Sequence, residues 1–139
     1  MRSGIGRAER RGVSIDLQVP EDLPQVAADR IQLQQVLLNL VSNAIDSMQD
    51  VVVNPKKLII RCQRQKNVIL TEIVDQGVGV TDYEKIFETF FTTKENGMGM
   101  GLPICRSIIE AHDGRLWASP GSPAGSIFSF TIPLPSTPV

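Results

Sequence analysis

Three glycines alternate with other residues immediately before a segment that has the apolar spacing of a helix. They are Gly97, Gly99 and Gly101, within the stretch TKENGMGMGLPICRSIIEAHDG. A glycine-rich loop that leads into a helix N-terminus can bind phosphate, because the unpaired N–H groups of the first turn point at the anion and the helix dipole favours negative charge. Lys94, just upstream, can add a full positive charge. Ordinary surface loops also carry short glycine patterns, so this stretch alone leaves both interpretations open.

Amide side chains form a second pattern, on a helix predicted over residues 29–50. Gln35, Asn39 and Asn43 follow one another at four-residue spacing and Asp46 comes three residues later, so all four share one helix face. Asparagine is a poor helix former whose amide needs polar partners, so two of them in mid-helix are costly unless something uses them. An amide oxygen suits Mg²⁺, which usually takes a few protein oxygens together with waters and substrate phosphates. The alternative is a set of amides that face solvent or cap a neighbouring loop.

Asp75 stands at the end of a predicted strand, directly before a glycine break that contains Gly77 and Gly79. A carboxylate in such a place can accept a hydrogen bond from an exocyclic amine, such as that of adenine. An aspartate before a glycine is also common in an Asx-turn, where its oxygen bonds to the backbone two residues on. Both interpretations stand at this point.

The composition indicates one ordinary globular domain of 139 residues, with a net charge of −1. Such a charge gives no general attraction to nucleic acid or to an anionic membrane. No apolar run approaches the ~18 residues of a membrane span, and no signal-peptide pattern is present, so we expect a cytoplasmic location. Residues 1–12 are expected to be a basic extension, 13–134 the folded domain, and 135–139 a disordered tail.

Apolar and polar residues alternate in five segments that are predicted to be strands: 13–19, 57–65, 68–75, 115–119 and 126–134. Helical spacing predicts helices at 29–50 and 102–113 and a single helical turn at 82–87. Gly114 is expected to end the last helix as a left-handed residue. Strands and helices mix without strict alternation, which favours one mixed, mostly antiparallel sheet with about three helices on one face.

Four of these stretches, in this order and spacing, resemble the sequence boxes of bacterial sensor histidine kinases. NLVSNAIDSM (39–48) resembles their N box, DQGVG (75–79) their first glycine box, IFETFFTTK (86–94) their F box, and GMGMGL (97–102) their second glycine box. GSIFSFTIPL (125–134) resembles the closing strand, so the resemblance covers about residues 13–134. The sequence around TTK in the F box and GMGMGL in the second glycine box is most similar to that of kinase domains that follow PAS sensor domains, such as those of the nitrogen-fixation oxygen sensors.

The resemblance implies the α/β (α+β) two-layer sandwich of the Bergerat-type GHKL fold, shared by gyrase, Hsp90 and MutL-type ATPases, with ATP and Mg²⁺ as its ligands. It implies that Asn43 coordinates the metal and that Asn39 supports the metal or its waters. Lys94 is expected to reach the phosphates and, with Asn39, to take part in catalysis. The other residues expected at the nucleotide are Asp46, Asp75, Gly77, Gly79, Gly97, Gly99, Gly101, Leu102 and Thr131.

The implied activity is transfer of the γ-phosphoryl group of ATP to a histidine on a separate dimerisation hairpin, with a response regulator downstream. No contact with nucleic acid or membrane is expected. His112 is the only histidine in the chain, and we expect it to cap its own helix, where a cation would suit the helix dipole. Asp113 stands where the family usually has a glycine, which leaves the left-handed position to Gly114.

Three other functions remain possible on this fold. A hydrolytic ATPase would place a glutamate where this chain has Asn39, and an amide cannot take a proton from water at neutral pH. A serine kinase that acts on a partner protein shares the fold. A non-catalytic interaction module would not need the four boxes to be intact, and a nucleotide titration would distinguish it.

Overall fold

The computed structural model describes residues 12–49, 56–77, 79, 82–87, 101–121 and 124–135. Their elements are β1 (Val13–Gln18), α2 (Arg30–Ser47), β2 (Lys56–Gln65), β3 (Val68–Val74), the 3₁₀ turn η1 (Lys85–Phe87), α3 (Gly101–Ala111), β4 (Arg115–Pro120) and β5 (Ser126–Pro133). The predicted order is confirmed, and the boundaries differ by only a few residues. The expected extension at the N-terminus and tail at the C-terminus lie almost entirely outside the described residues.

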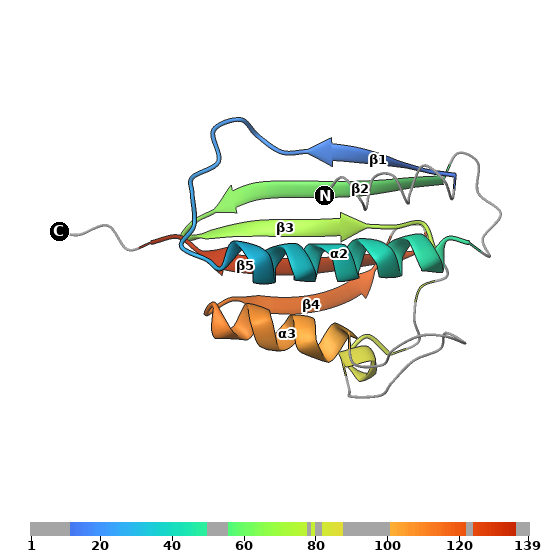
Figure 1. The fold of residues 1–139 in the computed structure, drawn as a ribbon. Helices are drawn as coiled ribbons and strands as arrows, with labels where there is room; N and C mark the ends of the chain where they lie inside the picture. The colour runs from blue at the N-terminus through green and yellow to red at the C-terminus, as the bar shows by residue number, and fades with distance from the viewer. Residues whose placement is uncertain are drawn as a thin grey trace.

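The strands form one sheet in the order β1-β2-β3-β5-β4. β1 pairs with β2 in parallel, and the other three pairs are antiparallel. Figure 1 shows α2 and α3 side by side on one face of this sheet. The predicted two-layer sandwich with a mixed, mostly antiparallel sheet is therefore confirmed, with two α-helices and η1 in the described part of the helical layer. Among the described helices, none is long and apolar enough to cross a membrane.

The core lies between the helices and the sheet, because one side of every element is apolar. The inner face of the sheet is aligned across the strands by pairs such as Ile60 with Ile73 and Ile73 with Phe128. The buried helix residues that cover it are Val36, Leu40, Val41, Ala44 and Ile45 on α2, and Cys105, Ile108 and Ile109 on α3. Burying each large aliphatic side chain contributes about 1.5–3 kcal/mol, so this contact fixes the rotation of both helices and the direction of their polar faces.

A single imidazole joins the C-terminal end of α3 to the N-terminal end of α2. His112 Nδ1 lies 2.8 Å from the carbonyl oxygen of Ile108, and His112 Nε2 lies 3.0 Å from the backbone nitrogen of Asp29. The carbonyl needs a donor and the N–H needs an acceptor, so the ring carries its proton on Nδ1 and is neutral. His112 therefore caps its own helix as expected, but as a neutral ring and not as a cation that complements the dipole.

The end of α3 corrects one expectation. Asp113, not Gly114, adopts the left-handed conformation, with a φ of 61°. The N–H groups of Asp113 and Gly114 bond to the carbonyls of Glu110 and Ile109, at 3.0 and 2.9 Å, as in a Schellman motif. Gly114 is needed for a different reason, because a Cβ atom there would collide with the carbonyl oxygen of Thr131.

This reassignment predicts opposite effects for two neighbouring substitutions. Asp113→Gly should raise the free energy of unfolding by up to about 1 kcal/mol, because glycine adopts positive φ without the steric cost of a Cβ. Gly114→Ala should lower it by more than that, because β5 backbone would have to move. Urea unfolding of the two variants measures both effects. Destabilisation by Asp113→Gly together with tolerance of Gly114→Ala would restore the original expectation.

Candidate functional site

The carboxyl group of Asp75 lies buried where β3 ends beside the start of β5. Only 3% of this residue is exposed. Its Oδ1 accepts hydrogen bonds from the N–H of Gly77 at 2.8 Å and from the N–H of Ser126 at 3.2 Å. The Asp75 N–H in turn donates to the Ser126 carbonyl at 3.0 Å. The Asx-turn that the sequence left open is thus present, and it holds the carboxylate in a fixed orientation.

Burial raises the pKa of Asp75 above its ordinary value, because a charged carboxylate is costly to remove from water. Hydrogen bonds from the N–H groups of Gly77 and Ser126 act in the opposite direction and favour the ionised form, and the nearby Ser47 side chain adds to this effect. One oxygen takes both backbone donors, so the carboxyl group keeps acceptor capacity for an additional donor. A ligand amine that donates to it would further stabilise its charge.

The two predicted glycines beside Asp75 have separate structural reasons. A Cβ atom on Gly77 would collide with the side chain of Ser47, which lies at the end of α2. Gly79 has a φ of +74°, which glycine adopts without strain. The turn after β3 therefore approaches the C-terminal end of α2 closely, and this brings Asp75 next to the helix that carries the asparagines.

The polar face of α2 lies beside α3. Asn39 Nδ2 donates to Cys105 Sγ at 3.5 Å. The amide oxygen of Asn39 is the acceptor of this side chain. Asn43 and Asp46 are half-buried on the same helix. Asn43 precedes Ser47 by about one helical turn, roughly 6 Å along the axis. The structure therefore brings the C-terminal half of this polar face and Asp75 to the same end of the helical layer.

In the described part of the chain α3 begins at Gly101, one residue before the predicted start. A Cβ atom on Gly101 would meet no heavy atom of the described residues within 4 Å. Leu102 packs against the core and holds the first turn to the sheet. The other residues predicted to contact the phosphates, Lys94, Gly97 and Gly99, lie outside the described residues.

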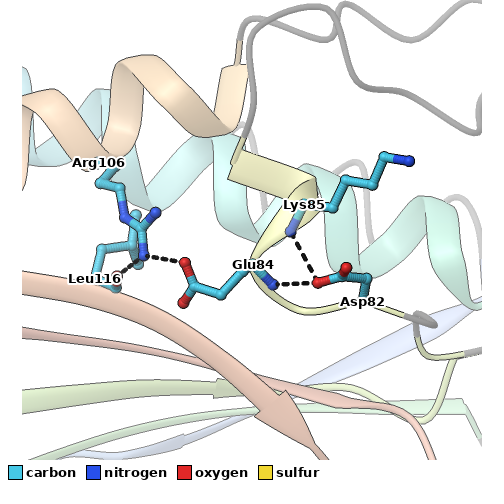
Figure 2. Close-up of polar contacts among 5 residues, drawn as sticks. All are labelled: Asp82, Glu84, Lys85, Arg106 and Leu116. Atoms are coloured by element: carbon cyan, nitrogen blue, oxygen red, sulfur yellow. Dashed lines mark hydrogen bonds and ion pairs between the residues drawn. The ribbon is translucent and has the colours of Figure 1, made fainter.

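Arg106 fastens α3 to the element that precedes it. Its Nη2 lies 3.5 Å from Glu84 Oε2 and 3.4 Å from the Leu116 carbonyl oxygen, and its guanidinium carbon lies 4.1 Å from the centroid of the Phe87 ring. Asp82 Oδ1 accepts from the N–H groups of Glu84 and Lys85, at 3.0 and 3.1 Å, and so caps the turn that leads into η1 (Figure 2). These contacts hold η1 against α3 at its first two turns.

The structure does not bring Thr131 to the other site residues. It lies five positions after Ser126 on β5, about 17 Å along the strand, and its hydroxyl accepts from the Arg115 N–H at 3.2 Å. Ser126 is the hydroxyl residue beside Asp75, and only 4% of it is exposed. A surface hollow of about 640 Å³ also lies elsewhere, over β1 and β2, and is lined by Gln18, Val19, Pro20, Arg61, Cys62, Gln63 and Glu72.

Three residues near Asp75 were not predicted from the sequence: Ser47, Ser126 and Tyr83. Ser126 could have been predicted from the sequence, because it begins the strand that pairs with the strand ending at Asp75. The sequence indicated Ser47 more weakly, because it directly follows Asp46, one of the predicted site residues. The sequence did not indicate Tyr83, because its proximity depends on how the turn after β3 folds back.

The raised pKa of Asp75 predicts a pH-dependent cost to stability in the nucleotide-free protein. The folded state holds this proton more tightly than the unfolded chain, whose ordinary value is 3.8. The resulting stabilisation is fully present below the unfolded pKa and is lost as pH rises through the folded pKa. Asp75→Asn keeps an acceptor oxygen but does not titrate, so wild-type stability minus variant stability should fall as pH rises above the ordinary value of 3.8. Urea unfolding at each pH tests this, and a constant or rising difference would contradict it.

Comparison with known proteins identifies the family. A family model described as histidine kinase-, DNA gyrase B- and HSP90-like ATPase matches residues 28–136. The sensor protein FixL of Bradyrhizobium diazoefficiens is 40% identical over 133 residues, which span 94% of this chain. The same alignment spans only 26% of FixL, so this chain corresponds to about a quarter of that relative.

Solved structures agree with the family model. The nucleotide-free catalytic domain of the histidine kinase ThkA superposes with a TM-score of 0.81 at 32% identity, covering 95% of this chain and 88% of that one. Full-length ShkA in complex with AMPPNP gives a TM-score of 0.83 at 26% identity, covering 99% of this chain and 29% of that one. The chain thus belongs to the histidine kinase-, DNA gyrase B- and HSP90-like ATPase family, and its relatives are sensor histidine kinases.

Proposed function

We propose that this domain binds Mg·ATP and, within a longer protein, donates the γ-phosphoryl group to a histidine on a separate dimerisation hairpin. The observation that carries the proposal is the buried carboxyl group of Asp75, oriented by two backbone N–H groups. It lies beside the polar face of α2, and α2 and α3 form one helical layer. A base-recognition group, a metal-binding face and an anion-binding helix end are the three parts that a nucleotide requires.

Recognition of the base rests on Asp75. A carboxylate only accepts hydrogen bonds, so it favours adenine, which presents an exocyclic amine, over guanine, which presents a carbonyl oxygen at the same ring position. Gly77 lets the turn after β3 pack closely against Ser47, and we propose that the purine lies against the backbone of this turn at Gly77 and Gly79. The fixed orientation of Asp75 means that little additional ordering is needed when the ligand binds.

The phosphates belong at the N-terminus of α3. The N–H groups of Gly101 and Leu102 belong to the first turn of α3 as the structure describes it, and N–H groups in a first turn can donate to an anion. Lys94, Gly97 and Gly99 are proposed to complete this contact. Arg106 supports it indirectly, because its contacts with Glu84 and the Leu116 carbonyl keep α3 in place.

The residues of α2 fit a magnesium ion that is shared with the nucleotide. Among the described residues, no group of three or more His, Cys, Asp or Glu side chains could hold a metal. A protein cage is therefore not available in that part of the chain, and amide oxygens with substrate phosphates and water are the donor set that Mg²⁺ accepts. We propose that Asn43 supplies a ligand and that Asn39 and Asp46 orient the surrounding water. The metal would neutralise charge on the transferred phosphoryl group.

Transfer to a histidine fits this chain better than hydrolysis of ATP. The amide of Asn39 cannot take a proton from water, and its Nδ2 is engaged with Cys105 Sγ. Catalysis would then consist of positioning and charge neutralisation, with Lys94 and the helix end acting on the phosphates. The partners that follow are the acceptor hairpin, through which the longer protein would dimerise, and a response regulator. Because ATP is a cytoplasmic substrate, we place the domain in the cytoplasm.

Asp75→Asn should weaken ATP binding while leaving the domain folded. The variant keeps an acceptor for the two backbone N–H groups but loses a charge-assisted bond to the adenine amine, worth roughly 1.5–3 kcal/mol, or about tenfold to a hundredfold in affinity. Calorimetric titration with ATP and GTP measures the change, and wild-type protein should prefer ATP strongly. Unchanged ATP affinity in the variant, or equal affinity of wild-type protein for GTP, would remove this role from Asp75.

Asn43→Ala should abolish most of the gain in ATP affinity that Mg²⁺ provides. Wild-type protein should bind ATP more weakly when Mg²⁺ is chelated, because Asn43 would hold an ion that neutralises phosphate charge. The matched control is Gln35→Ala on the same helix face, which is exposed and should keep the full Mg²⁺ effect. If Asn43→Ala also keeps it, Asn43 is only a structural amide.

A further inference from the structure

The hydroxyl of Tyr83 lies at the point where three segments of the candidate site meet. It is 3.4 Å from the carbonyl oxygen of Gly125 and 3.3 Å from the hydroxyl of Ser126. We propose that Tyr83 is a positioning residue for the base-accepting carboxyl group of Asp75, and that it acts through one peptide group. The proposal rests on the proposed function and adds to it the determinant that holds Asp75 in place.

The peptide group between Gly125 and Ser126 connects the two side chains. Its carbonyl oxygen accepts from the Tyr83 hydroxyl at 3.4 Å, and its N–H donates to Asp75 Oδ1 at 3.2 Å. The two ends of a trans peptide point in opposite directions, so Tyr83 and Asp75 lie on opposite sides of one rigid plane. A donor at the carbonyl polarises the peptide and strengthens its N–H as a donor, so the two hydrogen bonds reinforce each other.

The direction of each bond follows from the number of protons. The Tyr83 hydroxyl has one proton, and the carbonyl of Gly125 can only accept it. The hydroxyl of Ser126 must then be the donor in its contact with Tyr83. The Ser126 residue is thus held by its hydroxyl on the side of Tyr83 and by its backbone N–H on the side of Asp75.

The turn after Asp75, the start of β5 and Tyr83 approach one another closely at Gly125 and Gly79. Gly125 has a φ of +86°, and a Cβ atom there would collide with the carbonyl oxygen of Asp75. A Cβ atom on Gly79 would lie 3.5 Å from both the Tyr83 hydroxyl and the Gly125 carbonyl oxygen. The hydroxyl therefore sits against both the turn that follows Asp75 and the strand that supplies its second hydrogen bond.

The ring and the hydroxyl of Tyr83 have separable roles. The half-buried ring packs against the core beside η1, and phenylalanine would preserve this contact. Tyr83→Phe thus removes only the hydroxyl and its two hydrogen bonds. If the hydroxyl positions Asp75, its loss must affect the bond from Asp75 to the base amine and spare the phosphate contacts at α3.

The test compares ATP with the triphosphate of purine riboside, which lacks the exocyclic amine. Calorimetric titration of Tyr83→Phe should show ATP affinity lowered by about three- to tenfold, the usual effect of one hydrogen bond. Affinity for the amine-free analogue should change by less than about twofold. Unchanged ATP affinity, or an equal loss for both nucleotides, would overturn the proposal, since an equal loss is what a merely structural role produces.

Two further variants keep the result interpretable. Thr71→Val removes another buried hydroxyl, which lies on β3 and contacts Cys62 Sγ at 3.4 Å, and it should leave the ratio of the two affinities unchanged. Asp75→Asn should bring the two affinities close together. If Asp75→Asn binds ATP as wild type does, the proposed function fails. If it loses the preference for ATP while Tyr83→Phe keeps it, only the role of Tyr83 fails.

Discussion

A carboxyl group that is buried where two inner strands of a sheet meet must find hydrogen-bond donors, and this requirement shapes the whole site. Asp75 obtains them from Gly77 and Ser126, that is, from the turn that follows β3 and from the first residue of β5. Meeting that need brings the two segments together and gives the carboxyl group one orientation. Burial of the charged carboxylate still costs free energy, as the raised pKa of Asp75 shows. Functional sites commonly retain a local destabilisation of this kind.

The apolar layer between the helices and the sheet places everything else around that carboxyl group. Burial of the α2 stripe turns Asn39 and Asn43 to the side of α3, where Cys105 receives the amide of Asn39. His112 joins the opposite ends of the two helices as a neutral ring. These two contacts fix α2, which supplies the proposed metal ligand, relative to α3, which supplies the proposed phosphate contact.

Periodicity and turn chemistry were sufficient to predict the elements, the mixed sheet and the position of Asp75, since these depend on local pattern. The sequence could not show which residues meet across strands. Thr131 was chosen for its hydroxyl on the last strand, but the antiparallel register places Ser126 beside Asp75. The left-handed conformation after α3 was predicted at Gly114. The structure places it at Asp113. Glycine is necessary at position 114 because its backbone lies against the Thr131 carbonyl.

The proposed activity of this domain is transfer of a phosphoryl group to a histidine outside itself. The most direct measurement is incubation of the purified chain with Mg²⁺ and γ-labelled ATP, with and without the histidine hairpin of a sensor kinase. Both ring nitrogens of His112 are engaged at 2.8 and 3.0 Å, so the chain alone should remain unlabelled and release phosphate very slowly. With the hairpin present, label should appear on the hairpin only. Label on this chain that disappears in His112→Ala, or rapid release of phosphate, would contradict the account.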